Sequence, residues 1–197
     1  MPFLEPPPST LLVIDVQQGF DAPSWGRRNN PHLERRVSDL LHVWRGTGRP
    51  VVHVRHMSTD PSSALRPGQP GNAFKPATAP VAGEVVIEKR VHSAFIGTSL
   101  ETDLRRARCR GLVIVGLTTN HCVSTTARMA GNLGFVTWVV SDATATFDRI
   151  GPDGVEHRAE QIHAMALSDL HGEFATIVDT ADVVAALLVP SPSRSMP

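Results

Sequence analysis

Short apolar segments rich in β-branched residues alternate with helical segments along most of this chain. Strands are predicted at Thr10–Val16, Pro50–Arg55, Glu84–Lys89, Leu112–Gly116, Val136–Ser141 and Ala175–Asp179. Helices are predicted at His32–Trp44, Leu100–Ala107, Val123–Leu133, Gly154–Leu170 and Thr180–Leu188. This alternation is typical of βαβ units, whose right-handed crossovers place helices on both faces of a parallel sheet. The sequence therefore predicts an α/β fold, a three-layer sandwich around a six-stranded, mainly parallel sheet.

The 197 residues are enough for one domain with a full hydrophobic core. We expect a single domain over residues 1–189 and a disordered tail over 190–197, where proline and serine dominate. One segment, Met57–Val81, is rich in proline and glycine and fits no helix or strand. Loops of this length in a compact domain are usually functional or disordered. The segment is therefore a candidate lid, a candidate subunit contact or a surface loop without a functional role.

The composition excludes several classes of partner. The formal net charge is zero and no long basic run occurs, so neither nucleic acid nor an anionic membrane is expected as a partner. No apolar run approaches the ~18 residues of a membrane span, and the N-terminus lacks the basic and apolar regions of a secretory signal. Two cysteines make no disulfide framework. We therefore expect a cytoplasmic protein that acts on a small molecule and needs no cofactor.

Three chemically active side chains stand at predicted strand ends. Asp15 ends the first strand, Lys89 ends the third, and Cys122 follows the fourth where a turn leads into a helix. A parallel sheet collects the carboxyl ends of its strands along one edge, so these side chains are expected to meet there. The helix N-terminus and Lys89 would both favour the thiolate of Cys122, which is the nucleophilic form. We interpret the three residues as one catalytic constellation.

Four sequence segments carry a resemblance to a known family. They are LLVIDVQQGF with Asp15, EKRVHSAFIGTSLE with Lys89, VIVGLTTNHCVSTTARMAGNLGF with Cys122, and VVSDATATFD with Asp142. Together they make the chain resemble the isochorismatase-like cysteine hydrolases, the superfamily of nicotinamidases and N-carbamoylsarcosine amidohydrolase. The resemblance covers the chain from about Leu11 to Leu188.

The resemblance implies a catalytic triad of Asp15, Lys89 and Cys122. It also implies a cis peptide bond at Leu117–Thr118, an oxyanion hole formed by the N–H groups of Thr118 and Cys122, and a homo-oligomer, either a dimer or a tetramer. In such a site the thiolate attacks a carbonyl carbon and forms a thioester, which water activated by Asp15 then hydrolyses. The expected activity is cleavage of a C–N bond in a small amide or ureido compound.

Two other functions stay open. An isochorismatase of the same fold hydrolyses a vinyl ether without a cysteine nucleophile, and the presence of Cys122 favours amide hydrolysis over that reaction. A non-catalytic binding protein could also use this scaffold. The intact set of Asp15, Lys89 and Cys122 disfavours that possibility.

A metal site is not expected. Nicotinamidases of this superfamily bind a metal through an Asp-x-His pair and a second histidine after the second strand, whereas this chain has His53 and His56 there and no Asp-x-His. Residues three apart on a strand point to opposite faces, which argues against a metal shared by the two histidines. We expect His56 to line the substrate pocket and His121 to support the turn, with its ring directed away.

The substrate pocket is less defined by the sequence. Phe20, Trp25 and Phe95 follow the strand-end motifs and are candidates, with His56, for its wall. Arg55 and Arg66 are candidates for binding a substrate carboxylate, but the sequence does not fix the direction of either side chain. The sequence therefore leaves open the choice among amides, ureido compounds and vinyl ethers.

Overall fold

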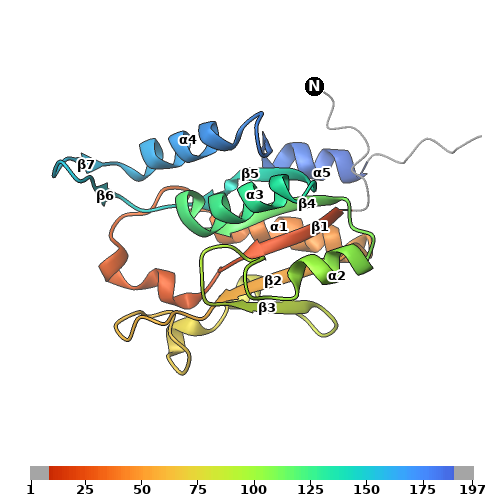
Figure 1. Cartoon of the computed structure of the whole chain (residues 1–197), viewed down its shortest axis with the longest axis horizontal. Coiled ribbons are helices and arrows are strands. Elements are labelled where there is room, and N and C mark those ends of the chain that lie inside the picture. The colour runs from red at the N-terminus through yellow and green to blue at the C-terminus, as the bar shows by residue number, and fades with distance from the viewer. Residues whose placement is uncertain (1–8, 189–197) are drawn as a thin grey trace, which may run out of the picture.

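The computed structural model describes residues 9–188, and its centre is a six-stranded parallel sheet in the order β3-β2-β1-β4-β5-β8 (Figure 1). The strands are β1 (Ser9–Ile14), β2 (Val51–His56), β3 (Val85–Lys89), β4 (Gly111–Leu117), β5 (Val136–Ala145) and β8 (Thr176–Val178). The predicted α/β fold is therefore confirmed. The tail predicted to be disordered lies outside the described residues.

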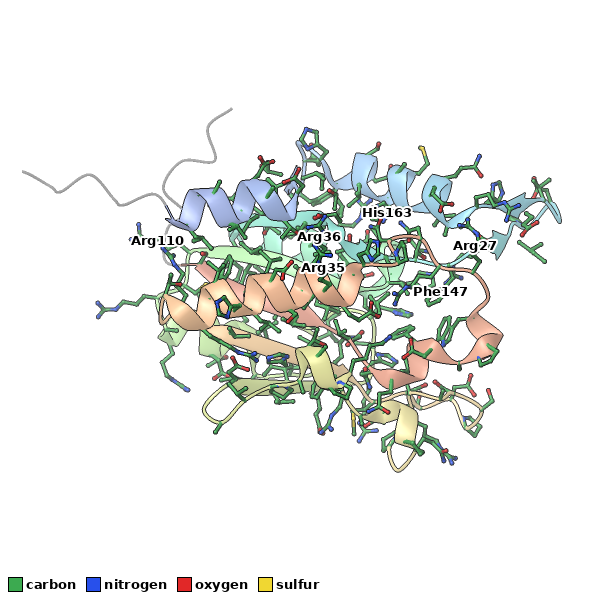
Figure 2. The ribbon with its side chains drawn as sticks, turned by 180° about the vertical axis from the view of Figure 1, so that it is seen from behind. Arg27, Arg35, Arg36, Arg110, Phe147 and His163 are labelled. Carbon is green, nitrogen blue, oxygen red and sulfur yellow. The ribbon has the colours of Figure 1, made fainter. Side chains whose placement is uncertain are left out.

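Helices cover both faces of this sheet (Figure 1). They are α1 (Leu33–Gly46), α2 (Leu100–Arg106), α3 (Ser124–Asn132), α4 (Ala159–Leu170) and α5 (Thr180–Leu188). α1 and α5 pack on one face, which Figure 2 shows from the front, and α2, α3 and α4 pack on the other. Among the described residues, no helix is both long and apolar enough to cross a membrane.

Alternating residues of the buried strands supply the two halves of the core. In β1, Leu11 and Val13 contact the α1 side, while Leu12 and Ile14 contact the α2 and α3 side. β4 is buried along its whole length, as expected of a central strand with both faces covered. The sheet is therefore held on both sides, and the carboxyl ends of its strands form a rigid edge.

Asp142 of β5, part of the fourth family motif, connects three elements. Its Oδ1 accepts hydrogen bonds from the backbone N–H and the hydroxyl of Thr180, both at 2.8 Å, at the start of α5. Its Oδ2 lies 3.2 Å from the Arg36 guanidinium on α1 (Figure 2). The carboxylate thus fixes both helices of one face to the same strand.

A two-stranded antiparallel hairpin departs from the sequence prediction. β6 (Arg149–Ile150) pairs with β7 (Glu156–His157), and α4 begins at Ala159 rather than at Gly154. Strands this short carry no periodic pattern, so the sequence did not reveal them. Asp148 Oδ1 accepts the backbone N–H of Ala159 at 2.7 Å and thereby defines the true start of the helix.

The long segment Met57–Val81 is held against the turn after β1. The Gln17 amide donates to the backbone oxygens of His56 and Asn72 at 3.1 and 2.9 Å, and Asn72 donates to that of Leu65 at 2.6 Å. Gly71 sits so close to Gly19 that a Cβ on Gly71 would lie 2.8 Å from the Cα of Gly19. These contacts place the segment beside the carboxyl edge of the sheet.

The strand order also determines where a ligand crevice can form. β1 and β4 are neighbours in the sheet, but the chain leaves β1 toward β2 on one side and leaves β4 toward β5 on the other. Crevices in open α/β sheets form at such a reversal, at the carboxyl ends of the strands. Gly116 of β4 pairs with Ile14 of β1 at this point.

We expect Gly116→Ala to destabilise the fold strongly. The φ of Gly116 is +117°, and a Cβ there would lie 1.9 Å from the backbone oxygen of Ile14. Strain and overpacking together predict a loss of at least about 2 kcal/mol in the free energy of unfolding. Urea denaturation measures this loss, and Gly46→Ala, with open space around its Cβ, is the matched control. Equal stability of the two variants would contradict the close approach.

Candidate active site

The Lys89 ammonium brings Asp15 and Cys122 together at the carboxyl edge of the sheet. Its Nζ lies 2.6 Å from Asp15 Oδ2 and 3.2 Å from Cys122 Sγ. The side chains of Asp15 and Lys89 are fully buried, and Cys122 is 7% exposed. The three residues come from the ends of β1, β3 and β4, which lie far apart in the sequence. The expected meeting of these side chains is therefore present in the fold.

Asp15 has an unusual backbone conformation. Its φ is +51°, in the left-handed region that few residues other than glycine adopt. The backbone N–H of Asp15 donates to Val54 of β2 at 2.9 Å, so the residue is held as β1 ends. Asp15 Oδ1 is buried and has no hydrogen-bond partner within residues 9–188. One carboxylate oxygen thus binds Lys89 and the other remains free.

Cys122 sits in a single π-helical turn, Thr119–Val123, that runs directly into α3. The peptide bond before this turn, Leu117–Thr118, is cis, at the position that the family resemblance implied. Neighbouring elements hold the turn, because the Thr146 hydroxyl donates to Asn120 at 2.6 Å and the Thr119 hydroxyl lies 2.9 Å from His163 of α4. The thiol is therefore presented from a fixed turn.

Burial affects the protonation of both Cys122 and Asp15. It raises the pKa of Cys122, and the neighbouring Asp15 carboxylate acts in the same direction. Burial also raises the pKa of Asp15, although the Lys89 ammonium opposes that rise. Lys89 lowers the pKa of Cys122 and so favours the thiolate, as expected from the sequence, but burial and the Asp15 carboxylate outweigh this effect. The site instead holds a thiol beside a carboxylate of increased basicity.

Two histidines complete the surroundings of Lys89 and Cys122. His56 Nδ1 lies 3.0 Å from Lys89 Nζ. An ammonium only donates, so this nitrogen accepts and the ring proton of the neutral His56 is on Nε2. His92 Nδ1 lies 3.4 Å from Cys122 Sγ. His92 was not predicted from the sequence as a site residue, although it is only three positions after Lys89 in the same motif.

A cavity of about 220 Å³ opens onto the Cys122 thiol. Phe20, Trp25 and His56, which were predicted for the pocket wall, line it, and so does Thr118, a candidate for the oxyanion hole. The rings of Phe20 and Trp25 are 4.9 Å apart, and Trp25 stacks on Phe147 at 5.2 Å, so they form a continuous aromatic wall. The loop Met57–Val81 adds Ser58, Asp60, Ser63 and Leu65 to the lining.

Two predictions for the pocket do not match this placement. Phe95 does not line the cavity, because its ring stacks on Phe135 at 6.0 Å within the core on the α2 and α3 side. His121 does line the cavity, although its ring was expected to point away. The Arg149 guanidinium lies 3.4 Å from His121 Nδ1 and holds the ring in this position.

The geometry does not suit a metal ion of the kind that nicotinamidases bind. His53 Nε2 lies 2.9 Å from Glu84, away from His56, as the strand alternation predicted. Candidate ligand atoms of Asp15, His56 and Cys122 do lie within 4.8 Å of one another. However, the Lys89 ammonium contacts all three residues and already supplies the positive charge between them.

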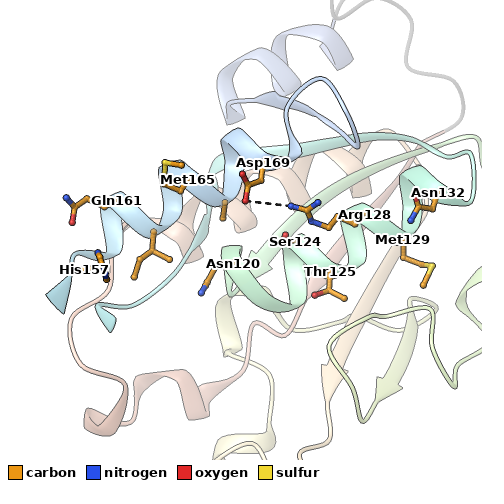
Figure 3. A pocket seen from close by; sticks show the side chains of 12 residues that line it. Asn120, Ser124, Thr125, Arg128, Met129, Asn132, His157, Gln161, Met165 and Asp169 are labelled. Atoms are coloured by element: carbon orange, nitrogen blue, oxygen red, sulfur yellow. Dashed lines mark ion pairs between the residues drawn. The ribbon is translucent and has the colours of Figure 1, made fainter. Parts of the chain in front are cut away.

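A second, wider hollow of about 720 Å³ lies between α3 and α4 (Figure 3). It is open to solvent, and the ion pair of Arg128 and Asp169 spans it at 3.7 Å. Its lining includes Asn120 of the π-helical turn but neither Cys122 nor Asp15. The chemistry of the site therefore belongs to the smaller cavity.

Comparison with known proteins agrees with this geometry. The isochorismatase domain family matches residues 9–182. The isochorismatase family protein YrdC of Bacillus subtilis is 45% identical, over 88% of this chain and 93% of its own length. The crystal structure of an isochorismatase-family protein from Chromobacterium violaceum superposes with a TM-score of 0.92 at 46% identity, covering 95% of this chain and 97% of that one.

More distant relatives have named activities. A maleamate amidohydrolase of Pseudomonas putida is 29% identical, over 90% of this chain and 85% of its own length. The domain match and the high identity to YrdC each cover most of the chain. The chain therefore belongs to the isochorismatase family of hydrolases.

Proposed function

We propose that this protein is a cysteine hydrolase that cleaves a C–N bond of a small, non-peptide amide or ureido compound through a thioester on Cys122. The observation that carries the proposal is the buried contact of Lys89 with both Asp15, at 2.6 Å, and Cys122, at 3.2 Å. The amidohydrolase among the relatives supports the same reaction class. The small cavity at the thiol fits a small substrate.

Acylation begins with the thiol and the free oxygen of Asp15. A carboxylate oxygen of Asp15 lies within 4.8 Å of Cys122 Sγ. As sulfur attacks the carbonyl carbon, Asp15 accepts the thiol proton. The N–H groups of Thr118 and Cys122 are the proposed donors to the oxyanion that forms. Asp15 then gives the proton to the leaving nitrogen, and an amine or ammonia departs.

Deacylation reverses the proton path. Asp15 takes a proton from water, which attacks the thioester carbonyl, and the acid leaves as Cys122 recovers its proton. Lys89 stabilises the developing negative charge on sulfur and keeps Asp15 ionised between the two steps. Vinyl-ether hydrolysis remains the second candidate, because the family also includes isochorismatases, and a non-catalytic binding protein is the third.

Intact-protein mass spectrometry with a panel of small primary amides and ureido acids tests the nucleophile. We expect an acyl adduct that maps to Cys122 and accumulates in Asp15→Asn, because that variant lacks the base for deacylation. Cys122→Ala should lose the adduct and at least about 10³-fold in rate. Cys109→Ser, which changes the other buried cysteine, is the control. Undiminished activity of Cys122→Ala would instead favour the vinyl-ether reaction.

The pH dependence of kcat/KM should report the pKa of Asp15. Because only the carboxylate form accepts the thiol proton, kcat/KM should fall as the pH falls through the pKa of Asp15. Burial raises that pKa, so the acid limb should lie above the ordinary aspartate value of 3.8. A pH–rate profile measures it, and His92→Gln should keep the limb if it belongs to Asp15. A flat profile down to pH 4 would contradict the assignment.

We also expect a homo-oligomer, a dimer or a tetramer. Large apolar side chains are exposed on the hairpin and on α4, with Ile150 76% and Met165 63% accessible, and a subunit contact would cover them. Size-exclusion chromatography with light scattering measures the mass. The mass of one 21.3 kDa chain would contradict this expectation.

A further inference from the structure

The wall of the active-site cavity carries carboxylates and, within the described residues, no lysine or arginine side chain. Among the described residues that line it, Asp15 and Asp60 are acidic and none is a lysine or an arginine. Lys89 lies behind this wall and is fully buried. Its three N–H donors are directed to Asp15, His56 and Cys122, so none is free for a substrate carboxylate.

Two of the histidines in the wall are uncharged at neutral pH. His56 accepts from Lys89, and His121 accepts from Arg149, because ammonium and guanidinium groups only donate. Burial lowers the pKa of both rings to about 4, and the neighbouring cations, Lys89 and Arg149, act in the same direction. Neither ring therefore supplies a cation to the cavity.

Arg55 and Arg27 are each paired with acidic side chains. Arg55 forms an ion pair with Glu88, and its guanidinium lies 5.4 Å from the centre of the Phe74 ring. Arg27 pairs with Asp148 at 2.8 Å and with Glu160 (Figure 2). Neither Arg55 nor Arg66, the sequence candidates for carboxylate binding, lines the cavity. Neither of these two candidates therefore offers its guanidinium to a substrate carboxylate in this wall.

Asp60 provides the charge at the loop side of the cavity. Its Oδ1 accepts the backbone N–H and the hydroxyl of Ser62 at 2.8 and 2.7 Å, and these bonds lower the pKa of the exposed carboxyl. Its Oδ2 has no hydrogen-bond partner in the described part of the chain. The aromatic wall of Phe20 and Trp25 lines the same cavity. Aromatic faces and carboxylates both attract cations and hydrogen-bond donors.

We propose that the substrate is a small amide or ureide without a negative charge, whose non-reacting end carries a hydrogen-bond donor, neutral or cationic, that binds Asp60. This inference rests on the proposed function and adds the substrate class. A carboxylate in the same cavity would lose its hydration without a lysine or arginine partner in the wall and would be repelled by Asp60.

Thiol-modifying reagents of different charge test the proposal without requiring the substrate. Three methanethiosulfonates are compared, the neutral methyl, the cationic trimethylammonioethyl and the anionic sulfonatoethyl compound. Rates of labelling at Cys122 are measured by mass spectrometry of peptides, which separates Cys122 from Cys109, and each rate is divided by the rate for free cysteine. We expect the normalised labelling rate at Cys122 to be about tenfold higher for the cationic reagent than for the anionic one. This cationic-to-anionic ratio is the effect of one charge nearby at an intermediate dielectric.

Two variants distinguish the effect of the Asp60 charge at the cavity from the effect of the net charge of the protein. Asp60→Asn keeps the Oδ1 acceptor and should reduce the ratio several-fold. Glu173→Gln removes one negative charge before β8, at the amino edge of the sheet, and should leave the ratio unchanged. In turnover assays, neutral and amino-bearing amides should be hydrolysed faster than carboxylate-bearing ones of equal size.

The outcomes distinguish the two proposals. A ratio equal to that of free cysteine, or one that Asp60→Asn does not change, would overturn the substrate class while the thioester mechanism stands. Undiminished turnover by Cys122→Ala would overturn the mechanism, and the labelling ratio would still report the charge of the cavity. Absence of labelling by all three reagents would contradict an accessible thiol and overturn both.

Discussion

The buried ion pair between Asp15 and Lys89 is the constraint on which the site depends. Burial of each charge costs several kcal/mol in lost hydration, and mutual attraction offsets this only when the geometry is good and further hydrogen bonds are made. Here the ammonium contacts Asp15 at 2.6 Å, His56 at 3.0 Å and Cys122 at 3.2 Å. The partners stand at the ends of different strands, so the parallel register of the sheet must hold for the pair to persist.

The same burial explains how a thiol beside a carboxylate can act as a nucleophile. A dry site raises the pKa of both Cys122 and Asp15, which keeps the sulfur protonated at rest and makes the carboxylate a better base. In the proposed mechanism, proton transfer therefore accompanies attack on the substrate rather than preceding it. In the same mechanism, the Lys89 ammonium compensates the negative charge as that charge moves from Asp15 to sulfur.

Surrounding segments enclose a cavity at this charged centre. The loop Met57–Val81 is fixed by Gln17 and Asn72 and contributes Asp60 to the wall. The π-helical turn contributes Thr118, His121 and Cys122. Since Asp15, His56 and Cys122 occupy the donors of the Lys89 ammonium, the proposed substrate class depends on the charge of the remaining wall.

The sequence by itself determined the α/β fold and the sites of Asp15, Lys89 and Cys122, because buried strands have distinctive composition and a parallel sheet collects their ends. Only the tertiary structure decided the protonation of the thiol, the exclusion of Phe95 and the contributions of His92 and Asp60. Side-chain direction in turns and loops depends on contacts between segments distant in the sequence, and local periodicity carries no information about such contacts.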